Sequence, residues 1–182
     1  MSKRDEILDV AEHLIRKAGY NAFSTRDVAE AVGIKSASVH YHFPTKSDIG
    51  AAVAERYTQR FLEALGDPLS FCAKRRDAVL CYIDAFRIAL VTDRELCLCA
   101  VLGAESRGLP DDVGKHARSF FEKNLAWLAT ALGSPAASGG KDYATACLIL
   151  AALEGAMILS QSLATDEVFE NVAAGLLASI QN

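Results

Sequence analysis

Hydrophobic and polar positions at the start of the chain alternate with the period of an α-helix. Apolar residues recur every three or four positions from Ile7 to Ala18, with acidic residues in the first turn and Gly19 directly after the last. Ser24 and Asp27 then form a capping box. This spacing predicts a second, short helix that ends at Gly33.

The segment 35–43 predicts a third helix whose outward face differs from that of an ordinary solvated helix. At about 100° per residue, Val39 and Phe43 share one side and can pack on the first two helices. The opposite side carries small, polar and aromatic residues in place of glutamate and lysine: Ala37, Ser38 and Tyr41, flanked by His40 and His42. A capped helix, a glycine turn and a further short helix together describe a helix-turn-helix.

Longer apolar stripes fill the remainder of the chain and predict six more helices. Their expected ranges are 46–65, 69–91, 94–106, 110–132, 142–164 and 166–180. Breaks fall at "GDP", "RGLP" and "GSPAASGG", and the last of these is typical of a surface loop between helices. The expected fold is therefore all-α, with about nine helices and an N-terminal helix-turn-helix.

The formal net charge of −4 conceals an uneven distribution. Every acidic residue among the first 46 lies at or before Glu30, so the stretch from Lys35 to Lys46 is purely basic and holds two histidines. A local positive face can bind phosphates on an acidic protein, because salt limits the reach of each charge to about 10 Å at 0.1 M. The charge pattern is therefore compatible with nucleic-acid binding.

Other features of the sequence favour a cytoplasmic protein that has no membrane span. The N-terminal charges run directly into the first helical pattern, without the apolar core of a secretory signal. The most apolar segment, from Tyr143, is interrupted by Glu154 and by 160–162, which favours a buried helix. The five cysteines are an odd number within apolar helical patterns, which indicates reduced thiols. We expect no cofactor.

The stretch "FSTRDVAEAVGIKSASVHYHFPTKSDI" resembles the DNA-binding domain of the tetracycline-repressor (TetR) family of bacterial transcriptional regulators. The similarity runs from about Ile7 to Ile49, in order and at the right spacing. It implies a DNA-binding domain over 1–46 and an effector-binding and dimerisation domain over 47–182. It also implies a homodimer on a palindromic operator of double-stranded DNA, released by a small-molecule effector, with repression favoured over activation.

The same resemblance implies a role for each matching residue. Phosphate contacts are expected from Thr25, Arg26 and Lys46, and Arg26 can also reach a base edge. The residues expected to face the major groove are Ser36, Ala37, Ser38 and Tyr41, and those expected to contact the backbone or bases are His40 and His42. The family often has a tyrosine at the position of His40, so the shorter imidazole alters that contact.

Candidates for ligand binding or sensing lie on the apolar helices of the second domain. They are Arg87, Cys97, Cys99, His116, Trp127, Glu154 and Gln161. Glu154 fits either a close-packed dimer interface beside Gly155 or a polar group of a ligand pocket. No metal site is expected, because residues two apart on a helix, such as His40 and His42, point in nearly opposite directions. No nucleophile stands beside a base, so we do not expect an enzyme.

Two alternatives to a reversible, ligand-released repressor remain open. The segment "CLCAVLGAE" resembles the core helix of electrophile- and oxidant-sensing members of the family, whose leading cysteine, here Cys97, is the reactive group. "TDRE" from Thr92 predicts a capping box that places Cys97 about five residues into a helix. The other alternative is a ligand-binding module with a vestigial DNA head, against which the intact "TR" and "HYHFPTK" stretches argue.

Overall fold

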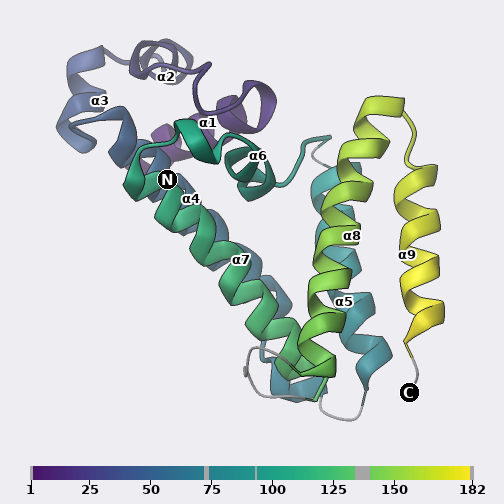
Figure 1. The fold of residues 1–182 in the computed structure, drawn as a ribbon. Coiled ribbons are helices and arrows are strands. Elements are labelled where there is room, and N and C mark those ends of the chain that lie inside the picture. The colour runs from purple at the N-terminus through teal and green to yellow at the C-terminus, as the bar shows by residue number, and fades with distance from the viewer. Residues whose placement is uncertain (1, 72–73, 93, 134–139, 181–182) are drawn as a thin grey trace. The chain divides into compact units, whose positions relative to one another are not determined.

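The computed structural model describes residues 2–71, 74–92, 94–133 and 140–180, and it confirms the all-α expectation (Figure 1). Within these ranges the chain forms nine α-helices and no strand. The helices are α1 (Lys3–Ala18), α2 (Thr25–Val32), α3 (Ser36–His42), α4 (Lys46–Leu65), α5 (Arg75–Arg87), α6 (Leu98–Ala104), α7 (Asp111–Ala131), α8 (Lys141–Leu163) and α9 (Glu167–Ser179). Three short helical segments accompany them: η1 (Pro68–Phe71), η2 (Ile88–Thr92) and η3 (Ser106–Gly108).

The expected helix over 69–91 is wrong in extent. The Asp67 carboxylate accepts the Leu69 N–H at 2.9 Å and the Asp67 carbonyl accepts the Ser70 hydroxyl at 2.7 Å, so η1 forms a separate turn. Regular α-helix occupies only α5, after which the backbone widens into the π-helical segment η2.

The expected helix over 94–106 is also wrong at its start. Arg94 has a φ of 57°, a left-handed conformation that a right-handed helix excludes, and helical structure begins only at Leu98. Cys97 therefore immediately precedes α6, and it does not lie five residues inside a helix. Asp93 of the expected capping box lies outside the described residues.

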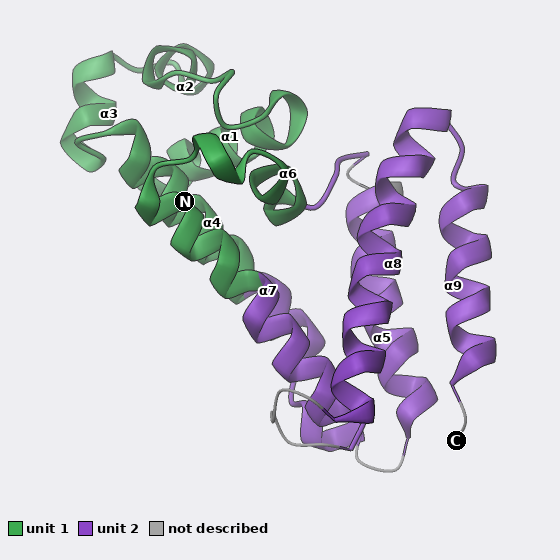
Figure 2. Ribbon diagram, viewed as in Figure 1, with its two compact units in different colours: residues 1–59, 98–120 green, residues 60–97, 121–182 purple. Residues whose placement is uncertain are grey.

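The chain divides into two compact units (Figure 2). Unit 1 contains Met1–Gln59 and Leu98–Phe120, and unit 2 contains Arg60–Cys97 and Phe121–Asn182. The helix-turn-helix thus shares a unit with α6 and the first half of α7. This is a division by packing, and the functional boundary after residue 46 remains a prediction.

Side-chain caps determine where the helices of unit 1 begin and end. The Ser24 amide donates to the Asp27 carboxylate at 2.8 Å while the Ser24 hydroxyl accepts the Asp27 amide at 3.2 Å, which confirms the predicted capping box. Gly33 then ends α2 in the left-handed region, with φ of 73°. Thr45 and Asp48 form the same reciprocal pair at the start of α4. These caps bracket α3 on both sides.

Two apolar anchors fix α3 on the remainder of unit 1. Val39 and Phe43 are buried, as the helical period predicts, and α3 packs on α2. The Arg4 guanidinium lies over the Phe43 ring, 5.0 Å from its centroid. The inner side of α3 is therefore fully occupied by structural contacts, and its outer side is not.

Unit 2 is held together by an aromatic cluster and by a tight α8–α9 turn. The clustered rings are Phe61, Phe71, Tyr82, Phe86 and Trp127. At the turn, Ala164 adopts a left-handed conformation and the Ser160 hydroxyl accepts the Phe169 N–H at 3.0 Å. Because this conformation and this hydrogen bond close the turn locally, α9 folds back along α8.

The outward side of α8 is strongly apolar. Among the described residues, α8 is the one helix long and apolar enough to cross a membrane by length and composition, a criterion that helices of protein cores also meet. Only 39% of its most apolar stretch is buried within this chain. The exposed large side chains of α8 are Leu148, Ile158, Leu159 and Leu163.

Candidate nucleic-acid interface

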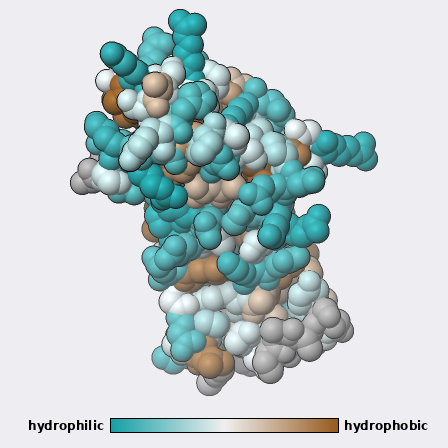
Figure 3. Space-filling view, turned by 90° about the vertical axis from the view of Figure 1, so that its left-hand side faces the viewer, coloured by the Kyte–Doolittle hydropathy of each residue, from teal (hydrophilic) through white to brown (hydrophobic). Residues whose placement is uncertain are grey.

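The outward face of α3 is accessible along its whole length. Tyr41 has 85% of its surface exposed, the largest exposed fraction given for any large apolar residue of the described chain. Ser36, Ala37, Ser38 and His40 are exposed as well, and His42 is half-buried. Seen from the side on which α3 lies, the surface is mainly hydrophilic (Figure 3). The face thus combines small side chains with one projecting phenol.

The two histidines of α3 have separate surroundings. His40 Nδ1 lies 3.1 Å from the Pro44 carbonyl, a hydrogen bond that ties its ring to the end of the helix. The His42 ring meets the Tyr41 ring edge-on, with centroids 5.3 Å apart. Among the described residues no group of three or more potential metal ligands is present.

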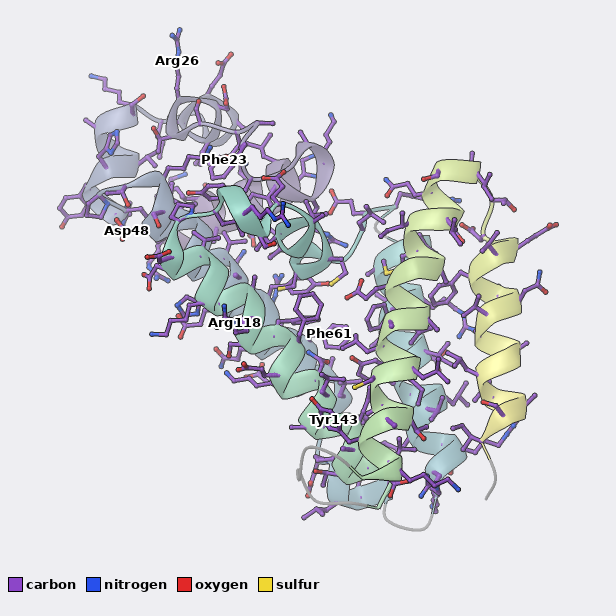
Figure 4. All side chains as sticks on the ribbon, in the orientation of Figure 1. Phe23, Arg26, Asp48, Phe61, Arg118 and Tyr143 are labelled. Atoms are coloured by element: carbon purple, nitrogen blue, oxygen red, sulfur yellow. The ribbon has the colours of Figure 1, made fainter. Side chains whose placement is uncertain are left out.

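The start of α2 contributes polar groups to the same unit. Thr25 is half-buried, whereas Arg26 is exposed and projects away from the helices (Figure 4). An extended guanidinium at this position is free of the neighbouring helices and can meet a phosphate or a base edge.

Lys46 is held in a pocket of aromatic rings. Its Nζ lies 4.6 Å from the centroid of Tyr20 and 4.7 Å from that of Phe23, and it donates to the Asn21 carbonyl at 3.5 Å. Burial lowers the pKa of Lys46, while the charges of Glu105 and Asp27 act in the opposite direction. One side of the Lys46 ammonium is therefore held by Tyr20, Asn21 and Phe23. The sequence alone did not indicate these contacts.

Sequence reasoning missed Arg4, Asn21 and Glu105. Glu105 Oε2 accepts the Asn21 backbone N–H at 3.1 Å and the Asn21 side-chain amide at 2.8 Å. The two residues are 84 positions apart, so no local pattern could have linked them. Arg4 is a basic residue in the first turn of α1, but only the fold brings it to Phe43.

Several sensing candidates of unit 2 have structural partners. Arg87 forms a bidentate ion pair with Glu170 at 2.8 and 2.9 Å, which joins α5 to α9, and it also pairs with Asp84. Trp127 Nε1 donates to the Gly66 carbonyl at 2.8 Å. Gln161 is exposed and lines a shallow pocket with Arg94. The contacts of Arg87 and Trp127 account for these two polar groups without a ligand.

Two candidates belong to unit 1 and stand in its interior or at its edge. Cys99 is completely buried in α6, and His116 is half-buried on α7.

Cys97 and Glu154 are brought together inside unit 2. Both carboxyl oxygens of Glu154 are buried and make no hydrogen bond that satisfies normal geometry. Burial raises the pKa of Glu154 to about 7, and the nearby Cys97 thiol lowers it in part. Burial also raises the pKa of Tyr82, with Glu154 and Cys97 adding to the effect. A buried carboxyl group without a cation is costly when ionised, which makes Glu154 the most unusual polar group of the unit.

Known proteins share both this fold and the helix-turn-helix sequence. Residues 7–53 match the family model described as bacterial regulatory proteins, tetR family. A TetR transcriptional regulator from Legionella pneumophila superposes with a TM-score of 0.91 and 30% identity, over 100% of this chain and 98% of that one. The chain belongs to the TetR family of transcriptional regulators.

Other relatives differ in how much they share with this TetR regulator. A TetR-family regulator from Agrobacterium tumefaciens has a TM-score of 0.89 at 28% identity, over 99% of this chain and 98% of that one. The Escherichia coli repressor ComR is 36% identical over 72 residues, 40% of this chain. The aligned segments span only 23% to 34% of the curated relatives, so those names describe the shared N-terminal region.

The buried Glu154 predicts a pH-dependent stability for this TetR regulator. Because the pKa is raised from 4.5 to about 7 in the folded state, the folded chain binds an extra proton between these values and stability falls as the pH rises through this window. Glu154→Gln removes the ionisation and should therefore be more stable than wild type above pH 7, by up to about 3 kcal/mol. Urea denaturation at pH 5 and pH 8 measures the difference.

The exposed Glu122 provides the matched control. Glu122→Gln should leave the pH dependence unchanged. A Glu154→Gln advantage of the same size at both pH values would contradict a buried, ionising carboxyl group.

Proposed function

We propose that this regulator binds double-stranded DNA through α3 as a homodimer, and that it represses transcription from a palindromic operator until a small-molecule effector releases it. The exposed outer face of α3, with Tyr41 projecting from it, carries the proposal. An aromatic ring exposed to water adds little to the stability of the fold, whereas it can contact base edges in a major groove.

The roles proposed for single residues follow from their placement around α3. Ser36, Ala37 and Ser38 are small and exposed, so they allow the helix axis to approach the base edges closely. Thr25 and Arg26 at the start of α2 and Lys46 at the start of α4 supply phosphate contacts that fix the register of the complex, and His40 and His42 flank the groove. In this division of labour, residues 1–46 form the DNA-binding domain and 47–182 the effector and dimer domain. The intact face also argues against a vestigial head.

The apolar outer surface of α8 and α9 supports the homodimer. On α8, helical spacing puts Gly155 on the same face as the exposed Leu148 and Leu159, and α9 carries Gly175. A Cβ added at either glycine would meet no atom within 4 Å. A glycine inside a helix costs about 1 kcal/mol relative to alanine, and nothing in this chain requires it. Close approach of a second copy explains both the glycines and the exposed leucines.

A two-fold dimer gives the operator its expected form. Two copies of α3 related by the dimer axis would occupy successive major grooves about 34 Å apart, so the two half-sites are inverted repeats. A regulator of this kind acts on the bacterial chromosome in the cytoplasm, and a dimer bound over a promoter blocks polymerase.

Glu154 is the group we propose to meet the effector. Its buried carboxyl oxygens make no hydrogen bond of normal geometry, so a ligand that supplies a well-placed donor would relieve the cost of their burial. Its place on α8 puts this exchange in the same helix as the proposed dimer surface.

A thiol sensor is the second candidate, and the position of Cys97 favours it. Cys97 directly precedes α6, so adding bulk to its sulfur would displace the first turn of that helix. The thiol is only 1% exposed, and reaction therefore requires the surrounding helices to open.

The DNA-binding role predicts that Tyr41→Ala separates binding from folding. Since Tyr41 is almost fully exposed, its loss should change the free energy of unfolding by no more than about 0.5 kcal/mol. Loss of a base contact should weaken binding to a duplex enriched by the wild type by about 10- to 100-fold. Fluorescence anisotropy measures this, with Leu69→Ala, an exposed residue of η1, as the control. Unchanged DNA affinity in Tyr41→Ala would remove α3 from the interface.

The dimer predicts that Gly155→Arg produces monomers. The added Cβ meets no atom of its own chain within 4 Å, so the monomer should stay folded while the interface, about 2,000 Å² or more for an obligate dimer, is blocked. Gly114→Arg on α7 is the matched control, because its added Cβ also meets no atom within 4 Å. Sedimentation velocity distinguishes the two variants. A dimeric Gly155→Arg protein would refute this interface.

The thiol alternative predicts that p-benzoquinone releases the operator from the wild type by conjugate addition of the Cys97 thiol. The sulfur bonds to a ring carbon as a C=C π bond of the quinone breaks, the S–H proton passes to the quinone, and the product is a hydroquinone thioether. Cys97→Ser should then resist release, while Cys99→Ser, whose sulfur is buried in α6, should respond as the wild type does. Anisotropy of a labelled operator follows the release. If both variants let go as readily as the wild type, the thiol sensor is excluded and a reversible ligand remains.

A further inference from the structure

Glu105, directly after α6, accepts hydrogen bonds from the turn between α1 and α2. Its Oε2 accepts both the backbone N–H of Asn21, at 3.1 Å, and the Asn21 side-chain amide, at 2.8 Å. Gly19, with φ of 90°, lies beneath the same carboxylate, and a Cβ built there would overlap Oε1. Glycine is therefore required at position 19, both by its backbone conformation and by the closeness of the Glu105 side chain.

The other side of the same turn holds Lys46. The Asn21 carbonyl accepts the Lys46 ammonium at 3.5 Å, and the rings of Tyr20 and Phe23 enclose it. Asn21 thus presents its N–H groups to an anion and its carbonyl to a cation. The Glu105 charge acts on Lys46 across this residue, because it raises the lysine pKa against the effect of burial.

The turn has little freedom to adjust independently of its neighbours. A Cβ added to Gly50 of α4 would stand 2.6 Å from Tyr20 Cε2 and 3.0 Å from Val113 Cγ2 of α7, so the Tyr20 ring and the Val113 side chain both pack closely on α4 at Gly50. All of these residues belong to unit 1, which also contains α6. A shift at the end of α6 must therefore move the turn as well.

We propose that Glu105 is a positioning residue that links α6 to the DNA contact of Lys46. By holding the Tyr20–Asn21 turn, its carboxylate fixes the place from which the Lys46 ammonium reaches a phosphate. Glu105 directly follows α6, and α6 begins directly after Cys97. Displacement of this helix would therefore move the Glu105 carboxylate, and with it the turn that positions the Lys46 ammonium. The proposal rests on the proposed function, in which Lys46 meets the DNA backbone.

The DNA test is a double-mutant cycle between Glu105→Ala and Lys46→Ala, measured by anisotropy on an enriched duplex over a series of KCl concentrations. Loss of the charged hydrogen bonds in Glu105→Ala should weaken binding about tenfold. If Glu105 acts through Lys46, Glu105→Ala should reduce the steepness of the fall of log K with log [KCl] by about one unit of slope, as Lys46→Ala does. The double variant should lose no more affinity than the more impaired of the two single variants.

Two further variants separate positioning from general stability. Glu105→Gln keeps an acceptor for Asn21 and should recover most of the affinity, whereas Glu122→Ala, which removes an exposed carboxylate of α7, should match the wild type. A merely structural role would lower the melting temperature but keep the salt slope, and its effect would add to that of Lys46→Ala. Either result would overturn the proposal.

A measurement without DNA tests the link between Glu105 and Lys46 separately from the proposed DNA binding. NMR titration of the Lys46 side chain in the free protein should show a lower pKa in Glu105→Gln than in the wild type, because the neighbouring negative charge is gone. An unchanged lysine pKa would overturn the link. A protein that binds no duplex would instead overturn the proposed function, and this titration would still decide whether Glu105 acts on Lys46.

Discussion

Burial of Val39 and Phe43 is the constraint on which the presentation of α3 depends. The helix has only seven residues and no side-chain cap at its start, so it has too little internal hydrogen bonding to persist alone. Its position comes from these two anchors and from the capped ends of α2 and α4. Since the inner side carries all of the structural contacts, the outer side is available for another purpose. Tyr41 and the small residues beside it occupy that side.

Contacts within unit 1 offer a physical path for the effector response that we propose. Unit 1 combines the helix-turn-helix with α6 and the first half of α7, so the helix that follows Cys97 packs directly with α1. Glu105 then joins the end of α6 to the α1–α2 turn, and Lys46 completes the connection. In unit 2, the buried Glu154 stands beside Cys97, at the point where the chain passes into α6. From Cys97 the chain continues directly into α6, and hydrogen bonds accepted by Glu105 connect the end of that helix to the α1–α2 turn beside Lys46.

Local chemistry made much of the fold predictable from the sequence. The Ser24–Asp27 box, the stop at Gly33 and the period-based anchors of α3 each depend on residues within a few positions of one another. The start of α6 was not predictable, because Arg94 takes up a left-handed conformation that its sequence does not favour.

The candidate site shows the same contrast. The exposed face of α3 follows from helical geometry and is marked by the family resemblance, which covers residues 7–53. The contact of Lys46 with the Tyr20 ring and the hydrogen bond from Asn21 to Glu105 join segments far apart in the chain, so only the fold reveals them. Glu154 was noticeable as a carboxylate in an apolar run, but whether its oxygens would find partners depended on the packing of unit 2.

Enrichment of DNA from a pool of random duplexes tests the central claim, a dimeric reader that presents two copies of α3. The protein should select an inverted repeat whose half-site centres lie about 10 base pairs apart, one turn of the double helix, and should bind it as a dimer. A pool that remains random after repeated selection, or that converges on an unrepeated site bound by one chain, would contradict it.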